Sequence, residues 1–345
     1  MRRKYKVRKM EVSLPIRINF GGAWSDTPPF CINEGGLVCS ASANINGKRP
    51  INVTIEEIDD EKIIIENDRA KLELKEIEPL EKINLQDEFA LFKIILDLVQ
   101  IRKKNFKLRV NCSDIPKGSG LGTSSIVALA VLKALYQFEE REIDIQQLIN
   151  QVLEVERRIG TGGGWQDQAG AVESGVKILT SNPGNYQEVK IKKIKMPIDA
   201  QKELQKRLLL IYTGETRNSK EIVHEIMEKY QNDVHVRDKI CQLKEIALQM
   251  ERALKEGDIG KFSELLNQNY ELSKTLNNKI ENRTTRKIFE MIDDLIDGKM
   301  ICGAGNGGFI EVILKKGIEK EELQLLLDKC FPNSLVKVWK VEIDF

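Results

Sequence analysis

Three consecutive glycines beside a tryptophan constrain this chain more than any other stretch of its sequence. They lie in GTGGGWQDQAG, residues 160–170, where an aspartate also stands between two glutamines. Glycine has high backbone entropy and no side chain to pack, so such a run is costly in an ordinary loop unless another group approaches the backbone closely. The stretch therefore predicts a pocket around residues 160–170.

A second glycine-bearing stretch, DIPKGSGLGTSSIVALAVLKAL at 114–135, leads directly into an amphipathic helical pattern with three hydroxyl residues at its start. Glycines let backbone N–H groups converge on an anion, and the positive end of a helix dipole favours negative charge there. The stretch predicts a phosphate-binding loop. It is not a Walker A loop, because no GK[ST] follows the glycines. A dinucleotide-binding turn or a simple helix cap remain alternatives for this stretch taken alone.

A third stretch, KMICGAGNGGFIEVIL at 299–314, places glycines between two apolar runs that resemble strands. Alone, this pattern is equally typical of a hairpin. Asn306 interrupts the glycines, and asparagine tolerates a positive φ better than most residues, so the turn is expected to survive. Three such stretches in one chain favour a ligand site.

Two carboxylates are candidates for chemistry at this site. Glu156 lies near the end of a predicted helix that Gly160 terminates, and the glycine run then lets the chain return Asp167 to its neighbourhood. Magnesium-dependent phosphoryl transfer needs oxygen ligands for the metal and an acid beside the nucleophile. A solvated helix charge is the alternative for Glu156.

The balance of charges excludes two classes of partner. Lysine and arginine number 54 and aspartate and glutamate 53, so the net charge of +1 provides no field that would attract nucleic acid or an anionic membrane. The six cysteines form no CxxC pair, which argues against a zinc site and a disulfide framework and favours a cytoplasmic location. The basic start, MRRKYKVRKMEVSLPIRI, is not followed by an apolar signal segment, and no run has membrane-spanning length.

The 345 residues predict about two domains of mixed helix and strand, an α+β class. Strand-like runs are 11–20, 51–58, 62–67, 71–77 and 106–112, and helical patterns are 87–102, 124–140 and 144–159. The second half begins with a strand at 207–214 and a long helical tract at 220–297 that is interrupted at EGDIG, 256–260. It ends with apolar runs in 300–314, a helix at 320–330 and a strand at 335–343. We place the domain boundary between 185 and 205.

In their order along the chain, these stretches resemble the signature motifs of the GHMP kinase superfamily. PIRINFGGAWSDTPP (15–29) is similar to the first motif of its sugar kinases, PKGSGLGTSSIVA (116–128) to the second and ICGAGNGGF (301–309) to the third. The resemblance implies a two-domain fold, with an N-terminal domain like ribosomal protein S5 domain 2 at 1–195 and a ferredoxin-like C-terminal domain at 196–345. It also implies ATP and Mg²⁺ as cofactors and a small-molecule sugar as substrate.

Within the superfamily, the resemblance is to the L-fucokinase branch. It is carried by AWSDTPPFCINEGG (23–36), NGKRPI (46–51), GTGGGWQDQAG and YTGETRNSK (212–220). This branch phosphorylates the anomeric hydroxyl of L-fucose and feeds GDP-fucose salvage, and we expect the kinase without a pyrophosphorylase domain. The rival is the branch of kinases for D-glycero-D-manno-heptose 7-phosphate. A catalytically silent sugar sensor and a Rossmann-type dinucleotide enzyme are further alternatives, and the oligomeric state stays open.

The resemblance implies a role for each matching residue. Asp167 would act on the proton of the anomeric hydroxyl, and Arg17 would lie beside it and the transferring phosphoryl group. Glu156 and Ser124, with Thr123 as the alternative hydroxyl, would meet the metal. The ATP-binding residues would be Lys117, Gly118, Ser119, Gly120, Leu121, Gly122, Thr123, Ser124, Ser125, Gly303, Ala304 and Gly305. The sugar-binding residues would be Trp24, Asp26, Gly164, Trp165 and Gln166, with both tryptophans against the C6 methyl face.

Overall fold

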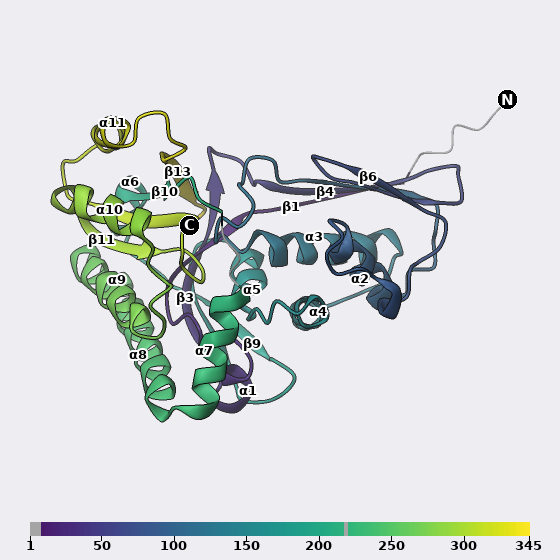
Figure 1. The fold of residues 1–345 in the computed structure, drawn as a ribbon, viewed down its shortest axis with the longest axis horizontal. Coiled ribbons are helices and arrows are strands. Elements are labelled where there is room, and N and C mark those ends of the chain that lie inside the picture. Colours follow the sequence, from purple (N-terminus) through teal and green to yellow (C-terminus); the bar gives the residue numbers. More distant parts are fainter. Residues whose placement is uncertain (1–7, 217–219) are drawn as a thin grey trace.

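Two β-sheets and the helices that cover them form the molecule (Figure 1). The computed structural model describes residues 8–216 and 220–345. The first sheet has the strand order β1-β4-β7-β5-β6, in which only the β5–β7 pair is parallel. Its strands are β1 (Lys9–Leu14), β4 (Ile51–Glu57), β5 (Ile63–Glu66), β6 (Lys71–Leu74) and β7 (Phe106–Asn111). All five fall within or next to the strand-like runs of the sequence.

Helix α3 (Thr123–Phe138) crosses one face of this sheet and determines where the second glycine stretch lies. It packs against β1 and β4 on one side and against α2 (Ala90–Val99) and α4 (Ile145–Ile159) on the other. Its residues are buried almost all round, as expected for a helix between two layers. The loop before α3 is therefore held at a fixed point in the fold.

The second sheet runs through both halves of the sequence. Its order is β11-β12-β10-β13-β3-β8-β9, and β2 also pairs with β3. Its strands are β2 (Ile16–Gly21), β3 (Leu37–Ile45), β8 (Val176–Ser181), β9 (Val189–Lys193), β10 (Leu208–Tyr212), β11 (Ile296–Ile301), β12 (Phe309–Leu314) and β13 (Lys337–Ile343). The antiparallel pair of β3 and β13 joins the two halves, so the sheet crosses the expected boundary at 195/196. That boundary stays a prediction.

Helix α9 (Ile259–Lys274) packs on β11, and α8 (Val234–Glu256), which packs against α9, contacts β2 and β3. They are separated where the sequence indicated an interruption: Gly257 ends α8 in the left-handed conformation and Asp258 caps α9. The remaining helices are α1 (Phe30–Glu34), α5 (Gln166–Val172), α6 (Ile198–Arg207), α7 (Lys220–Asn232), α8 (Val234–Glu256), α9 (Ile259–Lys274), α10 (Arg283–Ile292) and α11 (Lys320–Cys330), with short 3₁₀ turns at Leu80–Lys82 and Asp293–Leu295.

One large apolar core spans both halves of the chain, and a smaller cluster surrounds Trp165. The edge-to-face contact of Phe20 with Phe262, whose ring centroids lie 5.0 Å apart, connects β2 to α9. Among the described residues, no helix combines the length and apolar character needed to cross a bilayer. Two parts of the sequence analysis lie outside the described residues, namely the basic start at 1–7 and residues 217–219 of YTGETRNSK.

Candidate active site

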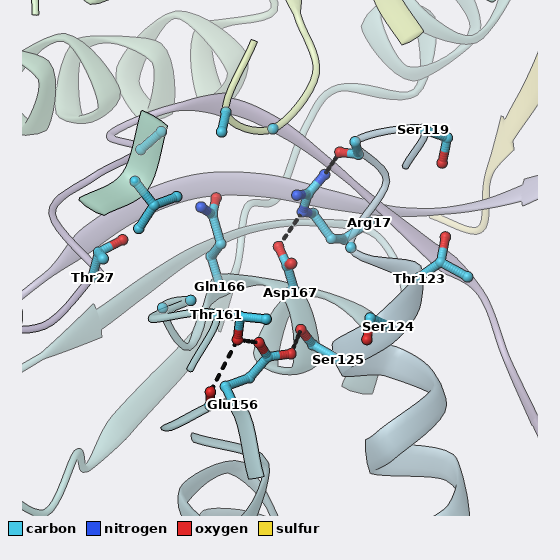
Figure 2. A pocket seen from close by; sticks show the side chains of 18 of the residues that line it. Arg17, Thr27, Ser119, Thr123, Ser124, Ser125, Glu156, Thr161, Gln166 and Asp167 are labelled. Atoms are coloured by element: carbon cyan, nitrogen blue, oxygen red, sulfur yellow. Dashed lines mark hydrogen bonds and ion pairs between the residues drawn. The ribbon is translucent and has the colours of Figure 1, made fainter. Parts of the chain in front are cut away.

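All three glycine stretches and the first motif contribute to one cavity between the two halves of the fold (Figure 2). The lining combines the start of β2, the loop after β2, the loop before α3 and the first turn of α3, the last turn of α4, the glycine run, the first turn of α5, α7 and the loop after β11. The lining residues are Arg17, Ala23, Trp24, Thr27, Gly118, Ser119, Gly120, Gly122, Thr123, Ser124, Ser125, Glu156, Thr161, Gly163, Gly164, Gln166, Asp167, Val223, Gly303 and Ala304.

The loop before α3 has the properties of an anion-binding loop. Gly118, Gly120 and Gly122 all have positive φ, at 65°, 84° and 70°. Gly122 is the N-cap of α3 and provides no side-chain hydrogen bond, so the first N–H groups of the helix are not capped by that residue. The hydroxyls of Ser119 and Thr123 are buried and have no hydrogen-bond partner among the described residues. This donor set suits phosphate oxygens.

Arg17 and Asp167 form the central ion pair of the cavity. Arg17 Nε donates to Asp167 Oδ1 at 2.7 Å, and Arg17 Nη1 donates to the Gly120 carbonyl at 2.9 Å. The Arg17 side chain is 3% exposed, whereas that of Asp167 is 23% exposed. Arg17 thus fixes both the acid and the glycine loop, and Oδ2 of Asp167 is left for a ligand.

Glu156 lies in the last turn of α4 and points into the cavity between two hydroxyls (Figure 2). Its Oε1 accepts a hydrogen bond from Ser125 Oγ at 2.7 Å, and its Oε2 interacts with the hydroxyl of Thr161. Burial raises the pKa of this carboxyl, and the two hydroxyl hydrogen bonds oppose that shift. The contact with Glu156 is thus made by Ser125, whereas Ser124 is exposed at the cavity wall.

This set of groups fits a magnesium ion that is bound largely by its nucleotide. Mg²⁺ prefers oxygen ligands and is usually held by one or two carboxylates together with substrate phosphates and water. The cavity offers the Glu156 carboxylate with the hydroxyls of Ser124, Ser125 and Thr123. Among the described residues, no group of three or more acidic, histidine or cysteine side chains forms a self-sufficient metal site.

The glycine run passes between two carboxyl groups, which explains why it lacks side chains. A Cβ at Gly164 would lie 2.0 Å from Asp26 Oδ2, and one at Gly163 would lie 3.4 Å from Glu156 Oε2. The close approach predicted from the sequence is therefore real. Part of it is made by the protein's own Asp26, and Gly164 separates that side chain from the cavity.

Five predicted site residues are not among those that line the cavity. Trp165 is wrong as a wall of the sugar pocket, because it is fully buried in the smaller core cluster and donates its indole N–H to Gln187 Oε1 at 3.2 Å. Asp26 is also fully buried, with Oδ2 accepting the Gln166 N–H at 3.1 Å. Leu121 is buried in the main core, Lys117 is exposed outside the lining, and Gly305 packs against the Ile280 backbone.

Other lining residues were missed by the sequence analysis. Thr161 and Gly163 stand within the quoted glycine stretch, and Ala23 and Thr27 stand within the first motif, so their motifs were the available signal. Val223 belongs to the helical tract that was interpreted as packing only, and nothing local in the sequence marks it. The expected positive φ at Asn306 is confirmed, at 63°.

Comparisons with known proteins agree with this geometry. Residues 90–175, which contain the loop before α3 and Asp167, match the model of the GHMP kinases N-terminal domain. A crystal structure of a D-glycero-D-manno-heptose 1-phosphate kinase from Bacteroides thetaiotaomicron superposes with a TM-score of 0.73 at 23% identity, covering 98% of this chain and 97% of that one. The chain belongs to the GHMP kinase superfamily. The predicted superfamily and its two-domain α+β fold are confirmed.

Two curated relatives of this chain are named for kinases of different sugars. The bifunctional fucokinase/GDP-fucose pyrophosphorylase of Arabidopsis thaliana is 31% identical over 95% of this chain, and the chain spans only 32% of that protein. The D-glycero-alpha-D-manno-heptose 7-phosphate kinase of Campylobacter jejuni is 25% identical over 97% of this chain and all of that protein. These names support the predicted enzyme class, a phosphotransferase with an alcohol group as acceptor.

Proposed function

We propose that this GHMP kinase transfers the γ-phosphoryl group of ATP to the anomeric hydroxyl of L-fucose, giving L-fucose 1-phosphate and ADP. The observation that carries the proposal is the Arg17–Asp167 pair. In one cavity, this pair lies beside the start of α3, which has no side-chain cap, and the glycine loop that precedes it. Phosphoryl transfer depends mainly on positioning and on electrostatic stabilisation, and this arrangement supplies both.

The reaction follows from the positions of the side chains. Oδ2 of Asp167 accepts the proton of the anomeric hydroxyl while that oxygen forms a bond to the γ-phosphorus and the bond to the ADP oxygen breaks. The Arg17 guanidinium and the N–H groups at the start of α3 offset the charge on the transferring group. Glu156 with Ser124 or Ser125 would hold Mg²⁺, whose positive charge would offset the negative charge of the phosphate oxygens.

The choice of L-fucose over a sugar phosphate rests on the charges in the cavity. Arg17 is the single basic side chain among the described lining residues, and it is engaged by Asp167 and Gly120. A heptose 7-phosphate would bring a second anionic group for which that lining offers no basic partner. Ala23, Trp24 and Val223 provide an apolar wall that suits a methyl group. We retain the cytoplasm as the predicted location, from cysteine usage.

A coupled ADP-release assay tests the proposal. It compares L-fucose with D-arabinose, L-galactose, D-galactose, D-mannose and D-glycero-D-manno-heptose 7-phosphate in the presence of ATP and Mg²⁺. We expect L-fucose to give the highest kcat/KM, and Asp167→Asn to lower it by about 10²- to 10⁴-fold, the usual contribution of a general base. Asp199→Asn, at a side chain that is 99% exposed, is the matched control.

Two results would contradict parts of the proposal. If heptose 7-phosphate is the best substrate, the kinase holds and the sugar is wrong. If ATP binds and no sugar is phosphorylated, the alternative of a silent sugar sensor replaces the kinase.

A further inference from the structure

Asp167, the acid at the centre of the cavity, lies on a helix that is too short to be stable on its own. Helix α5 has seven residues, and Asp167 stands in its first turn. Isolated helices well below about 12 residues are marginal in water, so contacts outside α5 must fix its position. What holds α5 therefore also determines where Asp167 points.

Lys177, on β8, binds the C-terminal end of α5. Its Nζ donates to the carbonyl of Gly170 at 2.8 Å and also to the carbonyl of Glu173. The last carbonyls of a helix have no partner within the helix, and a positive charge at that end interacts favourably with the helix dipole. Lys177 is fully buried, and α5 packs against β8, so this ammonium group serves the helix rather than solvent.

The middle of α5 lies directly on Arg17. A Cβ at Gly170 would lie 3.0 Å from Arg17 Cβ and 3.0 Å from Ser40 Oγ, so this glycine allows close contact between α5 and β2. Lys177 binds the carbonyl of that same residue. Lys177 thus fastens α5 at the residue where the helix meets the arginine that pairs with Asp167.

We propose that Lys177 is a positioning residue for phosphoryl transfer: its ammonium group fastens α5 so that Asp167 stays in register with Arg17 and the loop before α3. Lys177 acts through backbone carbonyls and does not line the cavity. The inference rests on the proposed role of Asp167, and it adds a residue that none of the sequence motifs contains.

The charge of Lys177 is sensitive to pH near neutrality. Burial lowers the pKa of Lys177 to about 7, while Glu173 opposes the shift and Lys193, across the β8–β9 pair, adds to it. Asp167 and the buried Asp26 lie toward the other end of α5, and Arg17 faces its middle. As the pH rises through about 7, Lys177 loses its proton and the fastening of α5 weakens. We therefore expect an alkaline limb in kcat.

The first test compares Lys177→Met with Lys193→Met, a matched control at the exposed partner position on the neighbouring strand. We expect Lys177→Met to lower kcat by about 10- to 100-fold, the effect of a small misplacement of a reacting group. The KM values for sugar and ATP should stay within about twofold. The alkaline limb of kcat should disappear in Lys177→Met. In Lys193→Met it should remain but lie at higher pH, because Lys193 no longer lowers the pKa of Lys177. Lys177→Arg should restore part of kcat.

The second test does not depend on turnover. Hydrogen exchange of peptides that cover residues 166–175 is measured on the full chain, with thermal unfolding as the check on folding. We expect faster exchange of α5 in Lys177→Met than in either the wild type or Lys193→Met, and faster exchange in the wild type above pH 7 after correction for the intrinsic rate.

The outcomes separate the two proposals. Unchanged α5 exchange, with kcat and KM altered together, overturns the positioning role of Lys177. If the wild type phosphorylates no sugar while α5 exchange still responds to Lys177→Met, the proposed kinase function fails and the fastening of α5 stands. If Lys177→Met does not fold, the test uses Lys177→Arg and the pH dependence of α5 exchange in the wild type. Absence of that pH dependence contradicts the proposal.

Discussion

At the scale of single residues, the position of Asp167 depends on the absence of a side chain at Gly122. A Cβ there would lie 2.6 Å from Asp167 Cγ, and the φ of Gly122 is +70°. We expect Gly122→Ala to displace the acid and lower kcat by about 10²-fold. Gly317→Ala is the control, because Gly317 also has a positive φ and no neighbour within 4 Å. If the two variants have equal kcat values, backbone strain, rather than the contact with Asp167, explains why residue 122 is a glycine.

The buried carboxyl group of Asp26 makes the stability of the folded chain depend on pH. Burial raises the pKa of Asp26 to about 7 from an ordinary value of 3.8, and its Oδ1 has no partner among the described residues. Between pH 4 and 7 the folded chain therefore binds more protons at this site than the unfolded chain, so stability contributed by Asp26 falls as the pH rises.

Asp26→Asn removes this dependence, because the amide stays neutral and its oxygen can still accept the Gln166 N–H. Measured by urea unfolding, the stability of the variant relative to the wild type should improve from pH 5 to pH 8, by at most about 3 kcal/mol. An identical difference at the two pH values would contradict a buried, shifted carboxyl at Asp26.

At the scale of elements, hydrogen bonds of Glu215 hold the third glycine stretch in position. Its carboxylate accepts hydrogen bonds from Asn282 Nδ2 at 2.5 Å and Thr284 Oγ1 at 2.6 Å, and its carbonyl accepts the Gly308 N–H at 3.1 Å. The loop after β10, the start of α10 and the glycine loop after β11 are thus tied together at one residue. Through Gly303 and Ala304 that glycine loop also lines the cavity.

We expect Glu215→Ala to loosen the glycine loop after β11 and raise the KM for ATP about tenfold, equivalent to ~1.4 kcal/mol of binding, with a smaller change in kcat. Steady-state kinetics at saturating sugar measures both constants. Glu228→Ala, at an exposed position of α7, is the control. A change confined to kcat would show that Glu215 serves the transfer step rather than nucleotide binding.

The sequence predicted elements whose pattern is local. The five strands of the first sheet and helices α2, α3 and α4 follow from periodicity and caps, and the glycine stretches located the cavity. Strand β3 was missed because Ser40 and Ser42, which are buried, alternate with small residues instead of large apolar ones. The burial of Trp165, the contact of Lys177 with α5 and the arrival of Val223 in the cavity depend on packing between distant segments, which no local pattern contains.

At the scale of the whole molecule, the cavity depends on a junction between the two halves. Strand β13 pairs with β3, Phe20 packs on Phe262, and the Phe309 N–H donates to the Ser119 carbonyl at 2.8 Å. The last of these bonds connects the third glycine stretch to the loop before α3. The loop before α3, Asp167 and the glycine loop after β11 therefore keep their positions around the cavity because one sheet and one core join the two halves.

We accordingly expect the two predicted domains, 1–195 and 196–345, to unfold together. In the Trp339→Phe variant, fluorescence reports on Trp24 and Trp165 in the first half, while far-UV circular dichroism is dominated by helices, including the long α8 and α9 of the second half. Separation of the halves would expose the β3 and β13 edges and the apolar surface between Phe20 and Phe262, so partial unfolding is unfavourable. Urea transitions followed by the two signals should coincide. Two separate midpoints would show that the halves are independent units and that the β3–β13 pairing contributes little to holding them together.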